Sequence, residues 1–174
     1  MTAQKYLITG LLFLCHTILS CAQSETFTSL KRVFSDNSEW TLATSNGDIS
    51  IKKVFSDNSQ WRVKWYNEEY LIERIFQDGS EWRMRTPEGV YLLKKTVSDG
   101  ASWSLSGDYD DYTIQRTFQD GSDWTGSGSK GNLSVHRTFS DGSHWDLSDS
   151  LKDTPAFAKI FISFVAIVSQ STRK

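Results

Sequence analysis

Apolar and polar side chains alternate along most of the chain, and short polar stretches interrupt this alternation at regular intervals. One alternating run covers residues 49–55, a second covers residues 61–65, and Asp57 and Asn58 lie between them. Alternation with a period of two is typical of a half-buried β-strand and not of a helix. Aspartate and asparagine favour tight turns. This part of the chain is therefore expected to form a β-hairpin.

The same pattern occurs six times, once every 21 residues and without insertion, and such a period indicates a repeat architecture. The repeat brings three sets of six residues into register. The tryptophans are Trp40, Trp61, Trp82, Trp103, Trp124 and Trp145. The cations, eight residues before each tryptophan, are Arg32, Lys53, Arg74, Lys95, Arg116 and Arg137. The turn aspartates are Asp36, Asp57, Asp78, Asp99, Asp120 and Asp141.

The turn that contains the aspartate sets the pairing of the strands on either side of it. The next residue is asparagine or glycine in all six repeats, as Asn58 is in the second. These residue types tolerate a positive φ, which a three-residue loop with a bulge requires. We therefore expect Lys53 to pair with Trp61, and Ile51 with Val63.

A second turn joins one repeat to the next, and in the first repeat it is centred on residues 46–47. An Asn-Gly pair suits a two-residue turn of the mirror-image type. The predicted pairs are Thr44 with Ile49 and Trp40 with Lys53. Both turns place the same side chains on one face, which is an internal test because a one-residue slip would reverse every side chain. The apolar face is expected to carry Ile51, Phe55, Trp61, Val63 and their equivalents.

Twelve such strands in an antiparallel meander predict a closed barrel, because an open sheet would leave the tryptophans in water and two edges unpaired. With strands about 4.8 Å apart and tilted about 40°, the backbone radius is roughly 12 Å. The bore is then about as wide as one helix with its side chains. A β-trefoil of three 42-residue units is the alternative, although the likeness of all six repeats favours the barrel.

The C-terminal segment offers a helix to fill this bore. Asp153, Thr154 and Pro155 are typical of a helix start, and residues 156–168 are apolar except at Lys159 and Ser163. A helix that is apolar on all sides must be buried on all sides. The many β-branched residues leave a further strand or a membrane-contacting tail as alternatives. Gly126 and Gly128 replace inward apolar residues, which would make room for the helix or open a local pocket.

Twelve antiparallel strands around a hydrophobic C-terminal helix resemble the tubby-like barrel. The resemblance covers residues 27–170 in outline and is architectural, because the chain contains no tubby sequence motif. It implies the fold alone, and no phosphoinositide site or functional residue is carried over.

The N-terminus resembles a bacterial lipoprotein signal, with Lys5 before an apolar stretch at residues 7–19 and a cysteine at position 21. The resemblance implies cleavage before Cys21, lipidation of its thiol and a location in the cell envelope. Ordinary signal cleavage after Ala22 is the alternative. The predicted division is a signal peptide at 1–20, a tether at 21–26, a six-repeat β domain at 27–149, and a linker with the apolar helix at 150–174.

Composition excludes several classes of function. The formal charge is −2, with 19 Lys plus Arg and 21 Asp plus Glu, which argues against binding nucleic acid by bulk charge. Both cysteines lie in the first 21 residues, so the repeats have no disulfide framework and no cysteine metal site. A dinucleotide-like glycine pattern at 126–131 has no helix after it and is rejected. We expect no catalytic residues, no metal and no cofactor.

Two sets of repeated residues are candidates for binding. The cations and tryptophans form a structural ladder of stacked cations, or alternatively a ring of six cations that binds an anion at one mouth. The end of the apolar helix is expected to approach this layer with its negative C-terminus. The six aspartates form a candidate binding rim.

The sequence therefore predicts a monomeric, non-catalytic, exported protein, anchored to the membrane by lipid, whose rigid barrel binds an unknown envelope or extracellular partner. A lipid or small-molecule carrier with the C-terminal segment as a plug is the alternative. Glycan binding by exposed tryptophan is a second alternative.

Overall fold

The twelve strands form one closed antiparallel barrel in the computed structural model, which describes residues 25–108 and 110–171. Each strand pairs with its neighbours in sequence, and the first pairs with the last to close the barrel. All six hairpins join the same sheet, so the β-trefoil alternative is wrong. The strands are β1 (Phe27–Arg32), β2 (Glu39–Thr44), β3 (Gly47–Lys53), β4 (Gln60–Trp65), β5 (Glu68–Arg74), β6 (Glu81–Thr86), β7 (Gly89–Lys95), β8 (Ser102–Ser106), β9 (Asp111–Arg116), β10 (Asp123–Gly128), β11 (Gly131–Arg137) and β12 (His144–Asp149).

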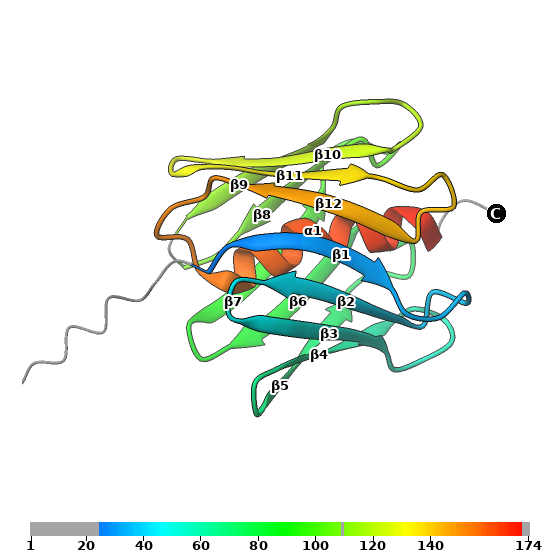
Figure 1. The fold of residues 1–174 in the computed structure, drawn as a ribbon, viewed down its shortest axis with the longest axis horizontal. Coiled ribbons are helices and arrows are strands. Elements are labelled where there is room, and N and C mark those ends of the chain that lie inside the picture. Colours follow the sequence, from blue (N-terminus) through cyan, green and yellow to red (C-terminus); the bar gives the residue numbers. More distant parts are fainter. Residues whose placement is uncertain (1–24, 109, 172–174) are drawn as a thin grey trace, which may run out of the picture.

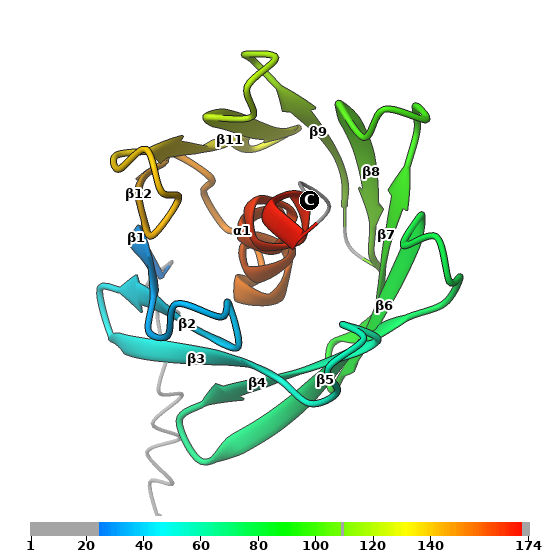
Figure 2. The same ribbon diagram turned by 90° about the vertical axis from the view of Figure 1, so that its right-hand side faces the viewer.

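A single helix, α1 (Ala156–Ser171), lies inside the barrel (Figure 2). From Phe157 to Val168 no residue is more than 7% exposed, including the two polar residues Lys159 and Ser163. The Ser163 hydroxyl donates to the Lys159 carbonyl one turn earlier, at 2.9 Å. The expectation of a buried helix is confirmed, and the helix extends three residues beyond the predicted end. None of the helices among the described residues has the length and apolar character needed to cross a membrane.

The two ends of the barrel differ in construction (Figure 1). One end, here called the aspartate rim, carries the six loops that contain the turn aspartates, such as the β1–β2 loop at residues 33–38. The other end, the hairpin end, carries the tight turns, the start of β1 and the start of α1. The helix therefore runs from the hairpin end to the aspartate rim, where its last turn lies.

The loops of the aspartate rim have the predicted register. Lys53 pairs with Trp61 and Ile51 with Val63. Asn58 has a φ of 59° and donates its N–H to the Phe55 carbonyl at 3.1 Å, which closes the turn. Asparagine and glycine are needed at this position because other side chains adopt positive φ at a steric cost.

The tight turns at the hairpin end differ from expectation by two residues. Thr44 pairs with Gly47, and Trp40 pairs with Ile51 instead of Lys53. The turn is shorter because the Thr44 hydroxyl donates to the Gly47 carbonyl at 2.7 Å and accepts the Asn46 N–H at 3.2 Å, while Gly47 has a φ of 136°. A slip of two residues leaves every side chain on its expected face.

The tryptophans of all six repeats lie in the core, each 3% exposed or less. Around α1 they pack with the other inward side chains of the strands. Trp61 and Trp82 contact the Phe164 ring edge to face, with ring centroids 5.7 and 5.2 Å apart. A Cβ atom added to Gly126 would lie 2.6 Å from the Ile162 side chain, so this glycine makes room for the helix.

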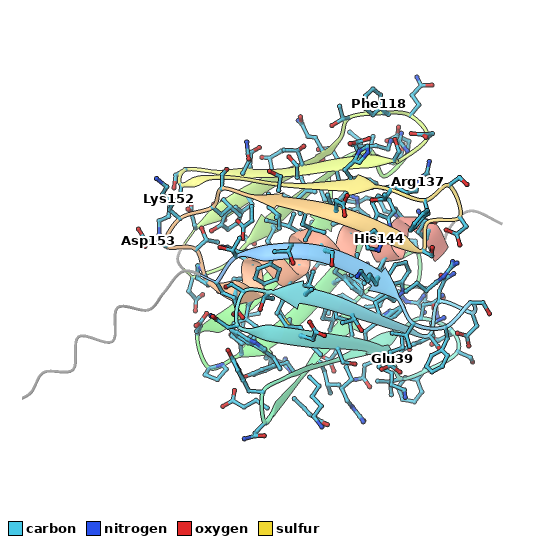
Figure 3. All side chains as sticks on the ribbon, in the orientation of Figure 1. Glu39, Phe118, Arg137, His144, Lys152 and Asp153 are labelled. Carbon is cyan, nitrogen blue, oxygen red and sulfur yellow. The ribbon has the colours of Figure 1, made fainter. Side chains whose placement is uncertain are left out.

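The apolar residue that opens each loop was expected on the inner face with Ile51, and this prediction is wrong. In all six repeats it lies in solvent, 45–57% exposed. The strand ends at Lys53 and the backbone bends over the next two residues, so the alternation of side chains no longer applies. Figure 3 shows one of these side chains, Phe118, at the aspartate rim. The six are Phe34, Phe55, Phe76, Val97, Phe118 and Phe139.

Candidate binding site at the aspartate rim

Each turn aspartate is tied into its own loop. In every repeat its Oδ1 accepts the backbone N–H two residues later, at 2.9–3.0 Å, as Asp57 does from Ser59. Serine hydroxyl and amide donors lower the pKa of Asp36, Asp57, Asp78 and Asp141 from its usual value. A carboxylate that accepts such bonds favours its charged form. The rim therefore keeps its negative charges through local bonds as well as through neighbouring cations.

The four arginines of the repeated cation set reach the aspartate of the preceding loop. The arginine side chains are largely covered, 15–19% exposed, whereas the side chains of the paired aspartates are 58–61% exposed. Arginine suits this position because its fork can contact the carboxylate and the backbone together, as Arg74 does with Asp57. The ion pairs are Arg32–Asp141 at 2.9 Å, Arg74–Asp57 at 3.3 Å, Arg116–Asp99 at 3.2 Å and Arg137–Asp120 at 2.8 Å.

The pair between Arg32 and Asp141 joins the first repeat to the last. As in the pairs between consecutive repeats, an arginine Nη2 contacts an aspartate Oδ2. The junction that closes the barrel therefore continues the repeat pattern. Each pair links adjacent hairpins at their loops. The predicted cation ladder thus contains four inter-repeat ion pairs that sequence reasoning did not foresee.

The two lysines of the set behave differently from the arginines. Lys53 Nζ lies 5.5 Å from the centroid of the Trp61 ring, and Lys95 Nζ lies 5.2 Å from that of Trp103. These are the stacked cations that the repeat predicted. Neither lysine forms an ion pair within 4 Å among the described residues, but each still attracts the aspartate of the preceding loop, because Lys53 helps to lower the pKa of Asp36 and Lys95 that of Asp78.

The indole N–H groups fall into two classes. Trp82, Trp103 and Trp145 each donate to the carbonyl of the glycine three residues earlier, at 3.1 Å. Trp40 and Trp61 follow loops with asparagine in place of that glycine, and their buried Nε1 atoms have no partner. Trp124 follows Gly121, yet its buried Nε1 also has no partner.

A cavity of about 450 Å³ opens at the aspartate rim, between the barrel wall and the last turn of α1. It lies on the side of the third to fifth repeats. Its lining includes three of the six cations, three of the six tryptophans, the two turn aspartates Asp78 and Asp99, and Val168 and Ser169 from the helix. The structure thus brings one half of the repeated set around a cavity, and the helix end approaches the cations as expected. The lining cations and tryptophans are Arg74, Lys95, Arg116, Trp82, Trp103 and Trp124.

The polar clusters do not assemble a metal site. Within residues 25–108 and 110–171, no group of three or more His, Cys, Asp or Glu side chains is arranged to hold a metal ion. His136 lies beside Asp123 on the outer wall, and His144 Nε2 lies 3.2 Å from Asp146. Cys21 and the predicted signal segment at 1–20 lie outside the described residues.

Comparison of the chain with protein-family models, with curated proteins and with solved structures finds no match. The likeness to the tubby-like barrel remains an architectural prediction. The function must therefore be argued from the rim, the cavity and the ends of the barrel.

Proposed function

We propose that the chain is a non-catalytic binding module of the cell envelope, which binds a protein partner at the aspartate rim. The barrel supplies a rigid support, and its closed sheet leaves no strand edge for self-association. This supports a monomeric module. The predicted lipid anchor at Cys21 precedes β1 by six residues, and β1 begins at the hairpin end. The aspartate rim would then point away from the membrane.

The observation that carries the proposal is the ring of six exposed apolar side chains at the aspartate rim, here called the apolar ring. An exposed apolar side chain is ordinary when it stands alone, whereas six such side chains on the loops of one end suggest an interaction site. Phe55 and Phe118, on loops from opposite parts of the barrel, are 54% and 57% exposed. The repeat places a half-exposed phenylalanine at this position five times out of six, and Phe139 contacts the His144 ring with centroids 5.6 Å apart.

The charges of the rim favour a protein partner over a lipid surface. Each apolar side chain is followed two residues later by an aspartate, and carboxylates such as Asp57 and Asp141 are 59% and 58% exposed. The exposed carboxylates, four of them paired with arginine, do not present the basic surface that binds an anionic membrane. A protein surface with an apolar centre and donors around it can match both features.

A binding role also agrees with the uniformity of the rim. Its acids and bases occur as the same ion pair in several repeats, and each carboxylate is held by its own turn. A catalytic site needs groups with distinct roles and matched pKa values. Equivalent groups in equivalent surroundings are suited to binding.

Site-specific photocrosslinking in the cells that make the protein tests the proposal. A photoreactive phenylalanine is placed at Phe55 and Phe118 of the full chain. The matched controls are Tyr66, which is 62% exposed at the hairpin end, and Leu71, which is 40% exposed on the outer wall. We expect one adduct of defined mass from both rim positions and none from the controls.

The second part of the test asks whether the amount of crosslinked adduct depends on the apolar ring. With the crosslinker at Phe118, the changes Phe34→Ser and Phe55→Ser should reduce the adduct without changing the melting temperature. Absence of an adduct at the rim, or equal adducts at Tyr66 and Leu71, would contradict the proposal. An adduct with lipid alone would replace the protein partner by a membrane.

The carrier alternative requires α1 to leave the barrel. Phe161, Phe164 and Val165 are fully buried, so their exit would expose the helix and the inner wall together. Glycan binding would need an exposed indole face, whereas the three tryptophans at the cavity are 1–3% exposed. The observations therefore favour a partner at the rim.

A further inference from the structure

We propose that the protein partner of the aspartate rim carries lysine or arginine side chains that pair with Asp36 and Asp78, on one half of the rim. This inference rests on the proposed function, because it names the chemistry of the partner that the rim binds. It follows from a difference between the repeats. Four rim aspartates form an ion pair with arginine, whereas these two form no ion pair among the described residues.

The residue at the repeated cation position decides whether the aspartate of the preceding loop is paired. Where this residue is arginine, the guanidinium reaches back to that loop and contacts the aspartate. Arg74 Nη2 donates to Asp57 Oδ2 at 3.3 Å, and Arg74 Nη1 donates to the Asp57 carbonyl at 3.0 Å. The planar fork of the guanidinium allows both contacts at once.

Lysine at this position lies over its own repeat instead. Lys53 Nζ is 5.5 Å from the centroid of the Trp61 ring, and Lys95 Nζ is 5.2 Å from that of Trp103. The Lys95 stem also lies beside Gly100 of its own hairpin, where an added Cβ atom would be 3.7 Å from the lysine Cε. An ammonium is a compact charge without a second arm. The lysine that stacks on its indole therefore leaves the aspartate of the preceding loop without a contact.

Asp36 and Asp78 are the two aspartates that face these lysines, and both are exposed. Their Oδ1 atoms accept the N–H of Ser38 and Ser80 at 2.9 Å, as in every rim loop. Hydrogen bonds from serine and, after them, the attraction of lysine lower the pKa of both carboxyl groups, which favours their charged form. Each is thus a charged acceptor that a cation from a partner can contact directly.

The two carboxylates flank a run of phenylalanines in the apolar ring. The loops β1–β2, β3–β4 and β5–β6 follow one another around the barrel, because its strands are arranged in chain order (Figure 2). They carry Phe34, Phe55 and Phe76, which are 53–54% exposed. Asp36 lies in the first of these loops and Asp78 in the third. On the other three loops every aspartate is paired with arginine.

The two halves of the rim therefore offer different surfaces to a partner. One half has apolar side chains between two carboxylates that lack an arginine, and the other has apolar side chains beside charges that already neutralise each other. A partner surface with an apolar patch between basic side chains is complementary to the first half. Exposed ion pairs add little affinity one by one, but complementary charge fixes the orientation in which a partner binds.

Two substitutions that convert the exceptional repeats into ordinary ones test the inference. In the double variant Lys53→Arg with Lys95→Arg the net charge is unchanged, and each guanidinium should pair with the preceding aspartate as Arg74 does. With the photoreactive phenylalanine at Phe118 of the full chain, we expect the protein adduct to fall by about threefold or more. The melting temperature should stay the same or rise.

The reverse exchange on the other half of the rim is the matched control. Arg116→Lys with Arg137→Lys also replaces two cations without changing the net charge, and it should not reduce the adduct. A second variant, Asp36→Asn with Asp78→Asn, keeps an acceptor for each turn and removes the two charges. It should reduce the adduct at least as much as the lysine-to-arginine variant does.

A peptide measurement tests the same chemistry without the natural partner. Fluorescence polarisation at low salt compares a labelled peptide of leucine and lysine with a peptide in which glutamine replaces each lysine. We expect the full mature chain to favour the lysine peptide by about threefold or more. Lys53→Arg with Lys95→Arg should remove most of this preference, and Arg116→Lys with Arg137→Lys should keep it. Since neither variant alters the net charge, the comparison excludes attraction by the whole protein.

Equal adducts from the unaltered chain and from Lys53→Arg with Lys95→Arg would overturn the inference and leave the rim as a partner surface. Equal reductions in that variant and in Arg116→Lys with Arg137→Lys would do the same. Absence of any protein adduct at the rim would contradict the proposed function instead, and the peptide preference would then decide the charge pairing alone. A peptide preference that is absent, or that survives the lysine-to-arginine change, would overturn it.

Discussion

Lys159 Nζ lies 2.8 Å from Asp149 Oδ2, and both side chains are 1% exposed. The same ammonium donates to the Glu25 carbonyl at 2.7 Å. The carboxylate accepts the N–H of Phe27 at 3.0 Å and that of Leu151 at 3.0 Å. One buried ion pair therefore joins the start of β1, the end of β12 and the first turns of α1. The closure of the barrel and the seating of the helix depend on the same two residues.

Removal of one member of this pair should be costly. Lys159→Met leaves a buried carboxylate without its counter-ion, and we expect the free energy of unfolding to fall by about 3–5 kcal/mol in urea denaturation. The double variant Lys159→Met with Asp149→Asn removes both charges and should recover part of the loss. A loss below about 1 kcal/mol in Lys159→Met, on the scale of an exposed ion pair, would mean that the pair is open to water.

The helix should be part of the folding unit. In a chain that ends at Lys152, the inner wall of the barrel, including Trp61, Trp82 and Ile72, would face an empty bore. We expect this chain to aggregate or to melt without cooperativity, as measured by solubility and circular dichroism against the full mature chain. A soluble truncated chain with a sharp transition would make α1 a removable plug and revive the carrier alternative.

The fit of Gly126 against Ile162 gives a test of packing. Gly126→Ala places a Cβ atom 2.6 Å from the Ile162 Cγ2 and should destabilise the protein by about 1–3 kcal/mol. Combined with Ile162→Ala, it should cost less than the sum of the two single changes, because the smaller residue relieves the overlap. Gly128→Ala meets Tyr112 instead, so Ile162→Ala should not relieve it. Strict additivity in the first pair would mean that the helix moves away.

The rim aspartates should make the folded protein less stable at acidic pH. Hydrogen bonds from serine hydroxyl and amide groups lower the pKa of Asp36, Asp57, Asp78 and Asp141 in the folded state. A lowered folded pKa adds stability above the unfolded value of about 3.9, and this stability is lost as pH falls through the folded pKa. We expect the melting temperature to fall between about pH 5 and pH 2.

Substitution at the rim separates this effect from general acid unfolding. Aspartate to asparagine changes at the same four positions keep an acceptor for the turn and remove the charge. The fourfold variant should have a lower melting temperature at pH 7 and a smaller fall towards pH 2. Equal falls in the two proteins would assign the acid sensitivity to groups other than these four aspartates.

Much of this architecture could be predicted from local rules. The 21-residue period set the number of strands, and alternation together with Asn58 and its equivalents set the register of the rim loops. The tight-turn register was wrong by two residues because the Thr44 hydroxyl bonds decide the turn length. Phe55 was misplaced because alternation stops where the backbone bends. These errors arise at strand ends, where the periodic rule no longer describes the backbone.

Periodicity and turn residues act locally, so they were enough to predict a barrel of six hairpins with tryptophans inside and a helix to bury. Packing in three dimensions sets which cations form an ion pair with a carboxylate and which lie over an indole ring. Arg74 and Lys95 occupy equivalent positions, yet the arginine reaches Asp57 while the lysine lies over an indole. The cavity depends on how one helix sits in a nearly symmetric bore, and that position results from packing over the whole molecule.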